Sequence, residues 1–142
     1  MHERLERVAD ELTSAVHARP PISAMLIAEA CGLTIATPNC RGKRGRGAVL
    51  IYDQDLPPDE QESQIALDLA YWRLNRVGLP FDDSDAVYTA RAIMLPRDFF
   101  LPDMRRTRDA VELRRVHKYA TLDMIRARMA DLASRALRLV GS

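Results

Sequence analysis

The chain has 142 residues and a formal net charge of +1, and 47% of its residues are hydrophobic. That length suits one domain, and the hydrophobic share excludes a largely disordered chain. The near-neutral total excludes a polycation that coats nucleic acid along its whole length. The charge is nevertheless divided: residues 1–100 carry 11 basic and 15 acidic side chains, and residues 101–142 carry 10 basic and 5 acidic ones.

The composition indicates a cytoplasmic protein with no membrane span. The N-terminal segment is charged and lacks the uninterrupted apolar stretch of a signal peptide. No stretch reaches the 18 or more consecutive apolar residues of a membrane-spanning helix. Cys31 and Cys40 are the two cysteines, and their spacing fits no zinc motif, so we expect two free thiols. The sequence thus predicts neither a metal ion nor a cofactor.

Two helices and two strands are predicted first. Apolar residues at helical spacing predict an amphipathic helix over 3–18, which a pair of prolines ends. A second, short helix covers 22–31, and Gly32 stands where a C-terminal glycine cap belongs. Residues 33–37 and 48–52 are β-branched and apolar, as in strands. We expect these strands to pair as a small antiparallel hairpin.

Helices dominate the remaining chain. The longest is predicted over 58–77, and it is apolar around much of its circumference, so we expect it to be central and buried. The next runs to about Leu95 after a cap at Asp82 or Ser84. A short aromatic segment and two further helices follow, and these are predicted over 97–104, 108–116 and 121–139. The fold class is therefore α+β, mainly helical, with a small antiparallel sheet.

Two consecutive helices carry a resemblance to a known family. Residues 65–76 (IALDLAYWRLNR) and 84–100 (SDAVYTARAIMLPRDFF) resemble the ImmA/IrrE-type metallopeptidases. In that family the first helix reads close to xAHELAHWLLNR, and the second ends close to LLMPRxxF. The resemblance extends over residues 20–134. It implies a zincin-like metallopeptidase domain over 1–101, followed by a helix-turn-helix-like segment over 102–142 that packs on it.

The family's catalytic positions are changed in this chain. The family's HExxH motif supplies two zinc-binding histidines and a glutamate that activates water, and those positions hold Leu67, Asp68 and Tyr71 here. Asp85 aligns with the family's third, acidic ligand. Leucine cannot ligate a metal and neutral tyrosine is a poor ligand, so we expect a degenerate site without catalytic residues. Tyr71 is expected to link the two helices by a hydrogen bond to Asp85 or Asp68. A Mg²⁺ or Ca²⁺ site built from Asp68, Asp85 and water is the alternative.

The resemblance implies a regulatory function. Active members of the family cleave helix-turn-helix repressors of phage, mobile-element or stress-response operons. An inactive relative would bind such a repressor, or another regulatory protein, without cutting it. A residual metallopeptidase with an atypical site is a further alternative.

Exposed cations and one aromatic residue are the candidate partner-binding residues. The glycine-rich loop over 38–47 is basic but lacks the P-loop spacing. Phe99 has no partner by periodicity and is predicted to line a partner groove, whereas Phe100 is predicted to lie in the core. The candidates are Arg41, Lys43, Arg44, Arg46, Phe99, Arg105, Arg106, Arg114 and Arg115.

The basic C-terminal helices support a second function. A helix, a turn and another helix form the outline of a helix-turn-helix DNA reader, so the alternative is a DNA-binding transcriptional regulator. Further positive charge on these helices comes from Arg108, Lys118, Arg126 and Arg128. The last helix also carries an apolar stripe, which would pack either on the domain or on a second copy of the chain in a homodimer.

Overall fold

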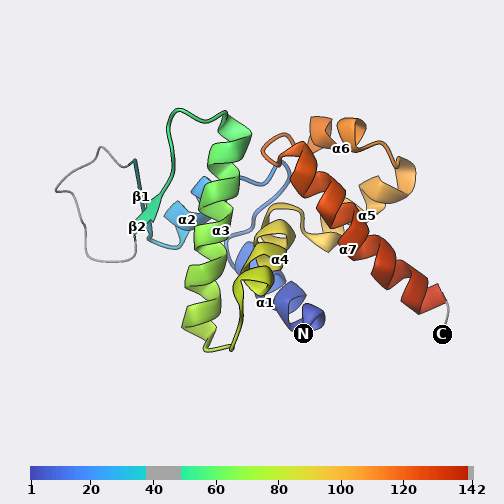
Figure 1. Cartoon of the computed structure of the whole chain (residues 1–142), viewed down its shortest axis with the longest axis horizontal. Helices are drawn as coiled ribbons and strands as arrows, with labels where there is room; N and C mark the ends of the chain where they lie inside the picture. The colour runs from blue at the N-terminus through green and yellow to red at the C-terminus, as the bar shows by residue number, and fades with distance from the viewer. Residues whose placement is uncertain (38–48, 141–142) are drawn as a thin grey trace.

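The computed structural model describes residues 1–37 and 49–140, with side chains up to residue 133. In these ranges the chain forms seven helices and a two-stranded sheet, an α+β, mainly helical architecture as predicted. The elements in chain order are α1 His2–Ala15, α2 Ala24–Ala30, β1 Thr34–Ala36, β2 Val49–Ile51, α3 Pro58–Val77, α4 Asp83–Met94, α5 Arg97–Arg106, α6 Ala110–Val116 and α7 Leu122–Val140. In Figure 1, α3 stands between the sheet on one side and α5 to α7 on the other.

The central helix α3 has the bounds that the sequence predicts. Pro58 starts it, where a missing N–H costs nothing, and Gly78 ends it in the left-handed conformation with φ 72°. One side is buried, formed by Ile65, Ala66, Leu69, Ala70 and Leu74. Helix α4 packs against both α1 and α3, and α7 packs on α4. Helix α3 therefore forms the centre of the fold, and α2, α4 and β2 pack against it.

The sheet is parallel, so the predicted antiparallel hairpin is wrong. Thr34 pairs with Val49 and Ala36 with Ile51 in a parallel register. Parallel strands need a connection of about a dozen residues, and residues 37–48 supply one. The chain leaves β2 and rises to the start of α3 at the top of Figure 1. The direction of β2 therefore follows from where α3 begins, which the strand sequences do not encode.

Helix α1 ends three residues earlier than the predicted end at residue 18. The Ala18 N–H donates to the Thr13 carbonyl at 2.9 Å, and the His17 N–H donates to the Ser14 carbonyl at 3.1 Å. This closure puts His17 at φ 54°, in the left-handed region where glycine is the usual residue. The backbone thus leaves the helix before the prolines are reached.

The aromatic segment after Pro96 is itself a helix, α5, which continues to Arg106. Over 97–104 the sequence predicts a short aromatic segment without an assigned helix. Pro102 lies inside α5, where a proline removes one backbone hydrogen bond. Burial compensates: Phe100 is fully buried and Met104 nearly so. Phe100 therefore lies in the core, as predicted.

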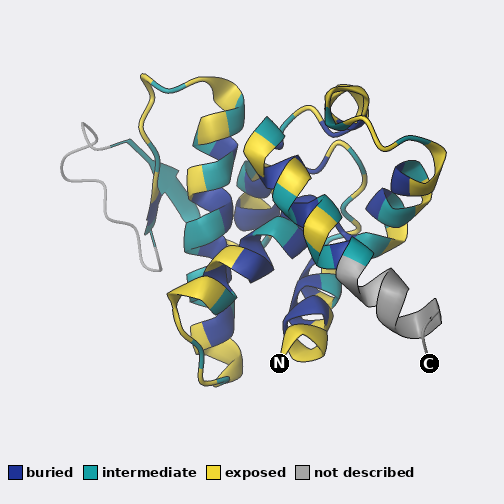
Figure 2. Ribbon diagram, turned by 45° about the vertical axis from the view of Figure 1, so that its right-hand side comes forward, coloured by how far each residue is buried: buried dark blue, intermediate teal, exposed yellow. Residues whose placement is uncertain are grey.

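One hydrophobic core crosses the predicted boundary at residue 101. It joins Leu69 of α3 and Phe100 of α5 to Leu113 of α6 and Ile125 of α7. Figure 2 shows the buried residues on the sides of the helices that face one another. Within the described ranges, no helix is long and apolar enough to cross a membrane.

A buried ion pair joins the first helix to the last. Arg128 and Glu6 are both fully buried, and Arg128 Nη2 donates to Glu6 Oε2 at 2.9 Å. Arg128 Nη1 donates to the other carboxylate oxygen, and Nε donates to the Leu95 carbonyl at 2.9 Å. The Tyr88 hydroxyl donates to Glu6 at 2.8 Å. Arg128 therefore supplies no charge to a DNA-facing surface, and its inclusion in that prediction is wrong.

Candidate functional site

The face of α3 that carries Leu67, Asp68 and Tyr71, the candidate positions from the sequence, is partly exposed. Leu67 is partly buried. It packs against the main core and against a second, smaller hydrophobic cluster of the described residues, which includes Leu5 and Leu74. Asp68 is also partly buried, beside β2. Burial raises the pKa of the Asp68 carboxyl, and a hydrogen bond from the backbone of Ile51 opposes that rise. The carboxylate thus bonds to the sheet edge.

Tyr71 links α3 to the start of α4, but through a residue that the sequence does not predict. Its hydroxyl donates to Asp83, and not to Asp85 or Asp68. This hydrogen bond, with a smaller contribution from desolvation, raises the pKa of the Tyr71 phenol. Asp83 opens α4 immediately after its cap, which puts it within reach of the tyrosine. A link between the two helices was predicted, but the predicted partners are wrong.

Asp85 serves the backbone of its own helix. Its Oδ2 accepts from the Asp82 N–H at 3.1 Å, while Asp82 Oδ1 accepts from the Asp85 N–H at 2.9 Å. The two aspartates form a reciprocal capping box. Among the described residues there is no group of three or more His, Cys, Asp or Glu that could hold a metal ion. Asp68 and Asp85, the candidate carboxylates from the sequence, thus have structural partners on different elements.

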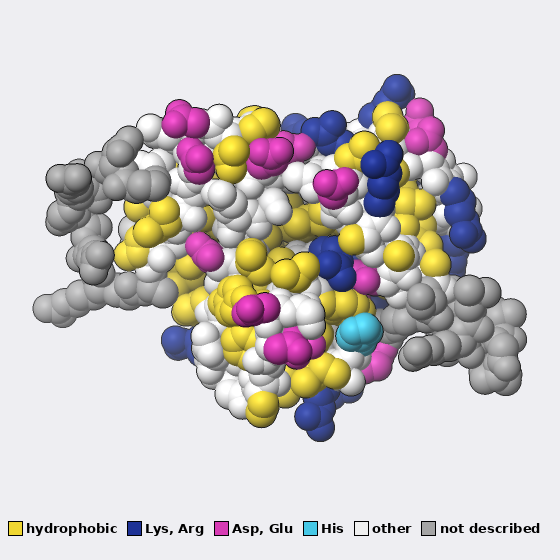
Figure 3. Space-filling model, viewed as in Figure 1, with side chains coloured by type: hydrophobic (Ala, Val, Ile, Leu, Met, Phe, Trp, Pro, Cys, Tyr) yellow, Lys and Arg dark blue, Asp and Glu magenta, His cyan; other side chains and the backbone are white. Residues whose placement is uncertain are grey.

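Two adjoining hollows lie over this face, and together we call them the central groove. The larger, of about 380 Å³, lies between α3, α4 and α7. The second, of about 330 Å³, lies between α3 and β2, and both are lined by Gln64 and Leu67. In Figure 3, hydrophobic side chains gather around the hollow at the middle of this face. Leu67 therefore sits where the two hollows meet.

The hollow between α3, α4 and α7 has mainly apolar walls, the hollow beside β2 has mixed polar and apolar walls, and carboxylates lie on the rim of both. Val87 and Ile51 are 42% and 51% exposed, and Met124 adds a further apolar side chain. Carboxylates border the groove at Asp53, Asp68 and Asp123. The one cation that lines it among the described residues, Arg91, is held by Asp131 through hydrogen bonds of 2.9 and 3.1 Å. An apolar segment flanked by cations would complement this surface.

The predicted basic candidates fall into two groups. Arg41, Lys43, Arg44 and Arg46 lie outside the described residues. Arg105, Arg106, Arg114 and Arg115 are exposed on α5 and α6, and basic side chains gather on that side of the molecule in Figure 3. Three of the four pair with carboxylates: Arg106 with Asp103, Arg114 with Asp59 at 2.6 Å, and Arg115 with Glu112 at 3.6 Å.

Phe99 and the last helix complete the predicted positions. Phe99 is partly buried and borders a separate hollow between α1 and α5. Leu132 of the apolar stripe on α7 is buried in the core, and the rest of that stripe lies outside the described side chains.

Cys31 is a free thiol, whereas Cys40 lies outside the described residues.

Sequence reasoning missed two buried polar residues of structural weight. Glu62 on α3 accepts from the Ser23 hydroxyl at 2.7 Å and from the Ala24 N–H at 2.6 Å. His117 is buried and bonds to Asp103 at 2.9 Å. The one available signal for Glu62 is its position three residues before Ile65, on the buried side of α3.

The comparisons with known proteins found no relative of this chain. No family model, no curated protein and no solved structure matches the chain.

Proposed function

We propose that this protein is a regulatory binding protein that holds a partner in the central groove without cleaving it. The proposal includes its resemblance to the ImmA/IrrE-type metallopeptidases, with a zincin-like domain whose motif has become Leu67, Asp68 and Tyr71. The observation that carries the proposal is the position of Leu67. A leucine at a zinc-ligand position lies where a mainly apolar hollow meets a more polar one, so the place that would bind metal offers hydrophobic contact.

The surface around Leu67 indicates the kind of partner. Apolar walls favour burial of hydrophobic side chains, at roughly 25 cal/mol per Å². The carboxylates on the rim favour a partner that carries lysine or arginine beside those side chains. The resemblance adds the class of partner, because members of that family act on helix-turn-helix repressors, whose DNA-binding helix carries cations for phosphate contacts. We therefore propose a helix-turn-helix repressor as the partner.

A matched pair of substitutions tests this function. Val87 borders the groove and Val116 at the end of α6 does not, and they are 42% and 46% exposed. If a helix-turn-helix repressor is encoded beside this gene, we expect Val87→Lys to weaken its binding by at least tenfold, because the substitution places a cation against a basic partner. Val116→Lys should change the affinity less than twofold. Isothermal titration calorimetry measures both.

Cleavage assays supply the opposing outcome. The purified protein, incubated with the repressor and with ZnCl₂, should leave the repressor intact in gel electrophoresis. Site-specific cleavage together with near-stoichiometric zinc would contradict the proposal and establish the residual metallopeptidase instead. If both lysine variants bind the repressor with equal affinity, the central groove is not the binding site.

The second candidate function is DNA binding through the basic C-terminal helices, with α6, the turn after it and the start of α7 at its centre. The observation that favours it is a hollow of about 310 Å³ lined by Val111, Arg114, Arg115, Lys118 and Leu122. Arg105 and Arg108 are exposed nearby in sequence. Against it, carboxylates already pair with several of these cations.

Salt dependence decides this candidate. If the cations contact phosphates, affinity for a 20-base-pair duplex must fall steeply as salt rises from 50 to 200 mM, because counterions are released on binding. The double variant Arg105→Gln, Arg108→Gln should lower the salt slope by about 2, because each arginine neutralises one phosphate. Fluorescence anisotropy measures the slope, and no binding at 50 mM salt would eliminate the DNA-binding candidate.

A further inference from the structure

A polar hollow between α1 and α5 has its own chemistry, apart from the central groove. It has a volume of about 240 Å³ and is lined by residues of the end of α1, the turn after it and the start of α5. We call it the α1–α5 hollow. None of its lining residues borders the central groove. The residues that matter for its chemistry are Asp10, His17, Arg19, Asp98 and Phe99.

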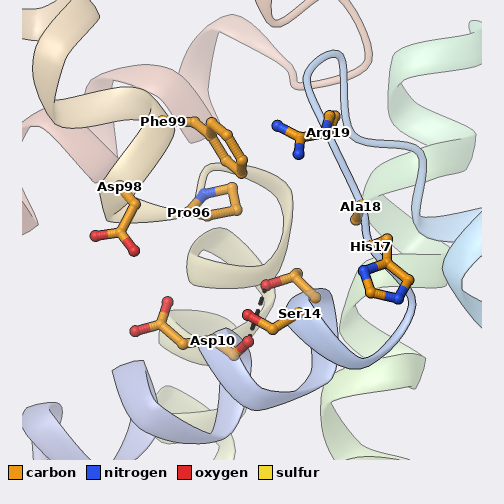
Figure 4. Close-up of a pocket in the computed structure, with 9 residues that line it drawn as sticks. Asp10, Ser14, His17, Ala18, Arg19, Pro96, Asp98 and Phe99 are labelled. Carbon is orange, nitrogen blue, oxygen red and sulfur yellow. Dashed lines mark hydrogen bonds between the residues drawn. The ribbon is translucent and has the colours of Figure 1, made fainter.

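The charges of this hollow are separated to opposite sides. Figure 4 shows the carboxylates of Asp10 and Asp98 facing each other on one side. Arg19 and His17 lie on the other side, and the rings of Phe99 and Pro96 lie along the wall near Asp98. The hollow therefore has an acidic end, a basic end and apolar rings between them.

Most of these charges remain available to a ligand. Asp98, Arg19 and His17 are exposed, and within the described part of the chain none of the three forms a salt bridge. Asp10 is partly neutralised by Arg97 at 3.1 Å. Burial raises the pKa of the Asp10 carboxyl, and the charges of Glu6 and Asp98 raise it further, while Arg97 opposes them. A bound cation at this end would relieve the repulsion between the two carboxylates.

The backbone at the basic end is in an unfavourable conformation. His17 has φ 54°, a conformation that costs a side chain of this kind free energy relative to glycine. Glycine there would close α1 with less strain. The histidine instead places an imidazole on the side of the hollow that holds Arg19, and residues held in strained conformations cluster at functional sites.

From this arrangement we infer that the α1–α5 hollow binds a lysine-type zwitterion, with an ammonium group at Asp98 and Asp10 and a carboxylate at Arg19 and His17. The alkyl chain between the two charges lies against the rings of Phe99 and Pro96. An ammonium with two carboxylates and a carboxylate with a guanidinium are charge-assisted pairs, the strong class of hydrogen bond. Free lysine and a peptide that ends in lysine share this chemistry.

Three probes of equal chain length test the inference. The first, 6-aminohexanoate, carries both charges, whereas hexylamine and hexanoate each carry one. We expect 6-aminohexanoate to bind at least tenfold more tightly than either analogue, measured by NMR shift perturbation at Phe99 and His17. Equal binding of all three probes, or binding of none, would overturn the inference.

Variants and ligand sources complete the test. Asp98→Asn and Arg19→Gln should each weaken 6-aminohexanoate at least tenfold, whereas Glu11→Gln, an exposed position of α1 outside the hollow, should change it less than twofold. Equal affinities in all three variants would overturn the site. Free L-lysine, a peptide ending in lysine and the same peptide with an amidated end distinguish the two sources, because loss of binding on amidation requires the terminal carboxylate. Tight binding of the amidated peptide would contradict the assigned basic end.

His17→Gly gives a readout that a structural role alone does not produce. Relief of the left-handed strain should raise the melting temperature, while loss of the imidazole should weaken 6-aminohexanoate several-fold. A variant that is stabilised with unchanged affinity would remove His17 from the site. Because the hollow and the central groove share no lining residue, failure here leaves the repressor proposal standing, and the reverse also holds.

Discussion

Replacement of Arg128 by alanine is expected to lower the free energy of unfolding by about 3–5 kcal/mol, the cost of leaving a buried charge without its partner. Arg128 is fully buried and bonds to Glu6, and also to the Leu95 carbonyl. Its removal leaves the Glu6 carboxylate in the core without the guanidinium, although the Tyr88 hydroxyl still donates to it. Urea unfolding followed by circular dichroism measures the loss.

The control for Arg128 lies on the same helix. Arg126 is exposed on α7, so Arg126→Ala should change stability by no more than about 0.5 kcal/mol. A comparable loss in both variants would mean that the helix needs arginine for reasons other than the ion pair.

Acid gives a second readout of the same pair. Burial alone would raise the pKa of Glu6, but the hydrogen bonds and positive charge of Arg128 hold it below its ordinary value of 4.5. A carboxyl whose pKa is lower in the folded state stabilises the fold above the unfolded-state pKa, and that contribution is lost as the pH falls through the folded-state value. The wild-type protein should therefore lose stability below about pH 4.5 through Glu6. In Arg128→Ala this contribution should shrink or change sign.

The second large effect is expected at Glu62, whose replacement by alanine should cost roughly 2–4 kcal/mol, because it leaves buried donors without an acceptor. The carboxylate accepts from the Ser23 hydroxyl and from the N–H groups of Ala24 and Met25, at 2.7, 2.6 and 3.2 Å. It thereby fixes the start of α2 against α3. Thermal unfolding and urea unfolding both report the loss.

Two variants separate the role of Glu62 from the general effect of removing a carboxylate. Glu62→Gln keeps one acceptor oxygen, which can still accept from the Ala24 and Met25 N–H groups, and should lose about half as much stability as Glu62→Ala, since the charge and the acceptor for the Ser23 hydroxyl disappear. Glu60→Ala, at an exposed position of the same helix, should stay within about 0.5 kcal/mol of the wild type. A neutral Glu62→Ala would show that α2 docks without this cap.

Local signals predicted the parts of the fold that depend on neighbours in sequence. The bounds of α3 follow from Pro58, Gly78 and the apolar spacing between them, and the cap at Asp82 follows from its position before the α4 pattern. Those signals act within one or two turns of helix, so the sequence carries them directly.

Long-range partners explain what the sequence did not reveal. The direction of β2 depends on where α3 begins, and the burial of Arg128 depends on Glu6 at the other end of the chain. The periodicity predicted that Arg128 lies on a basic helix, but it does not indicate that Arg128 pairs with the Glu6 carboxylate. At the candidate site, the resemblance drew attention to Leu67, Asp68 and Tyr71, whereas the hydrogen bond from Tyr71 to Asp83 depends on how α4 starts.

The pairing of Glu6 with Arg128 has a consequence for the order of folding during synthesis. The two residues are 122 positions apart, and at about 5–20 residues per second the ribosome needs roughly 6–24 s to add that length of chain. Throughout that time the Glu6 carboxylate lacks the guanidinium that bonds to it in the folded protein, so its burial costs more free energy. The packing of α1 on α4 therefore gains its full stability only after α7 has been synthesised, because the ion pair joins helices from opposite ends of the described chain.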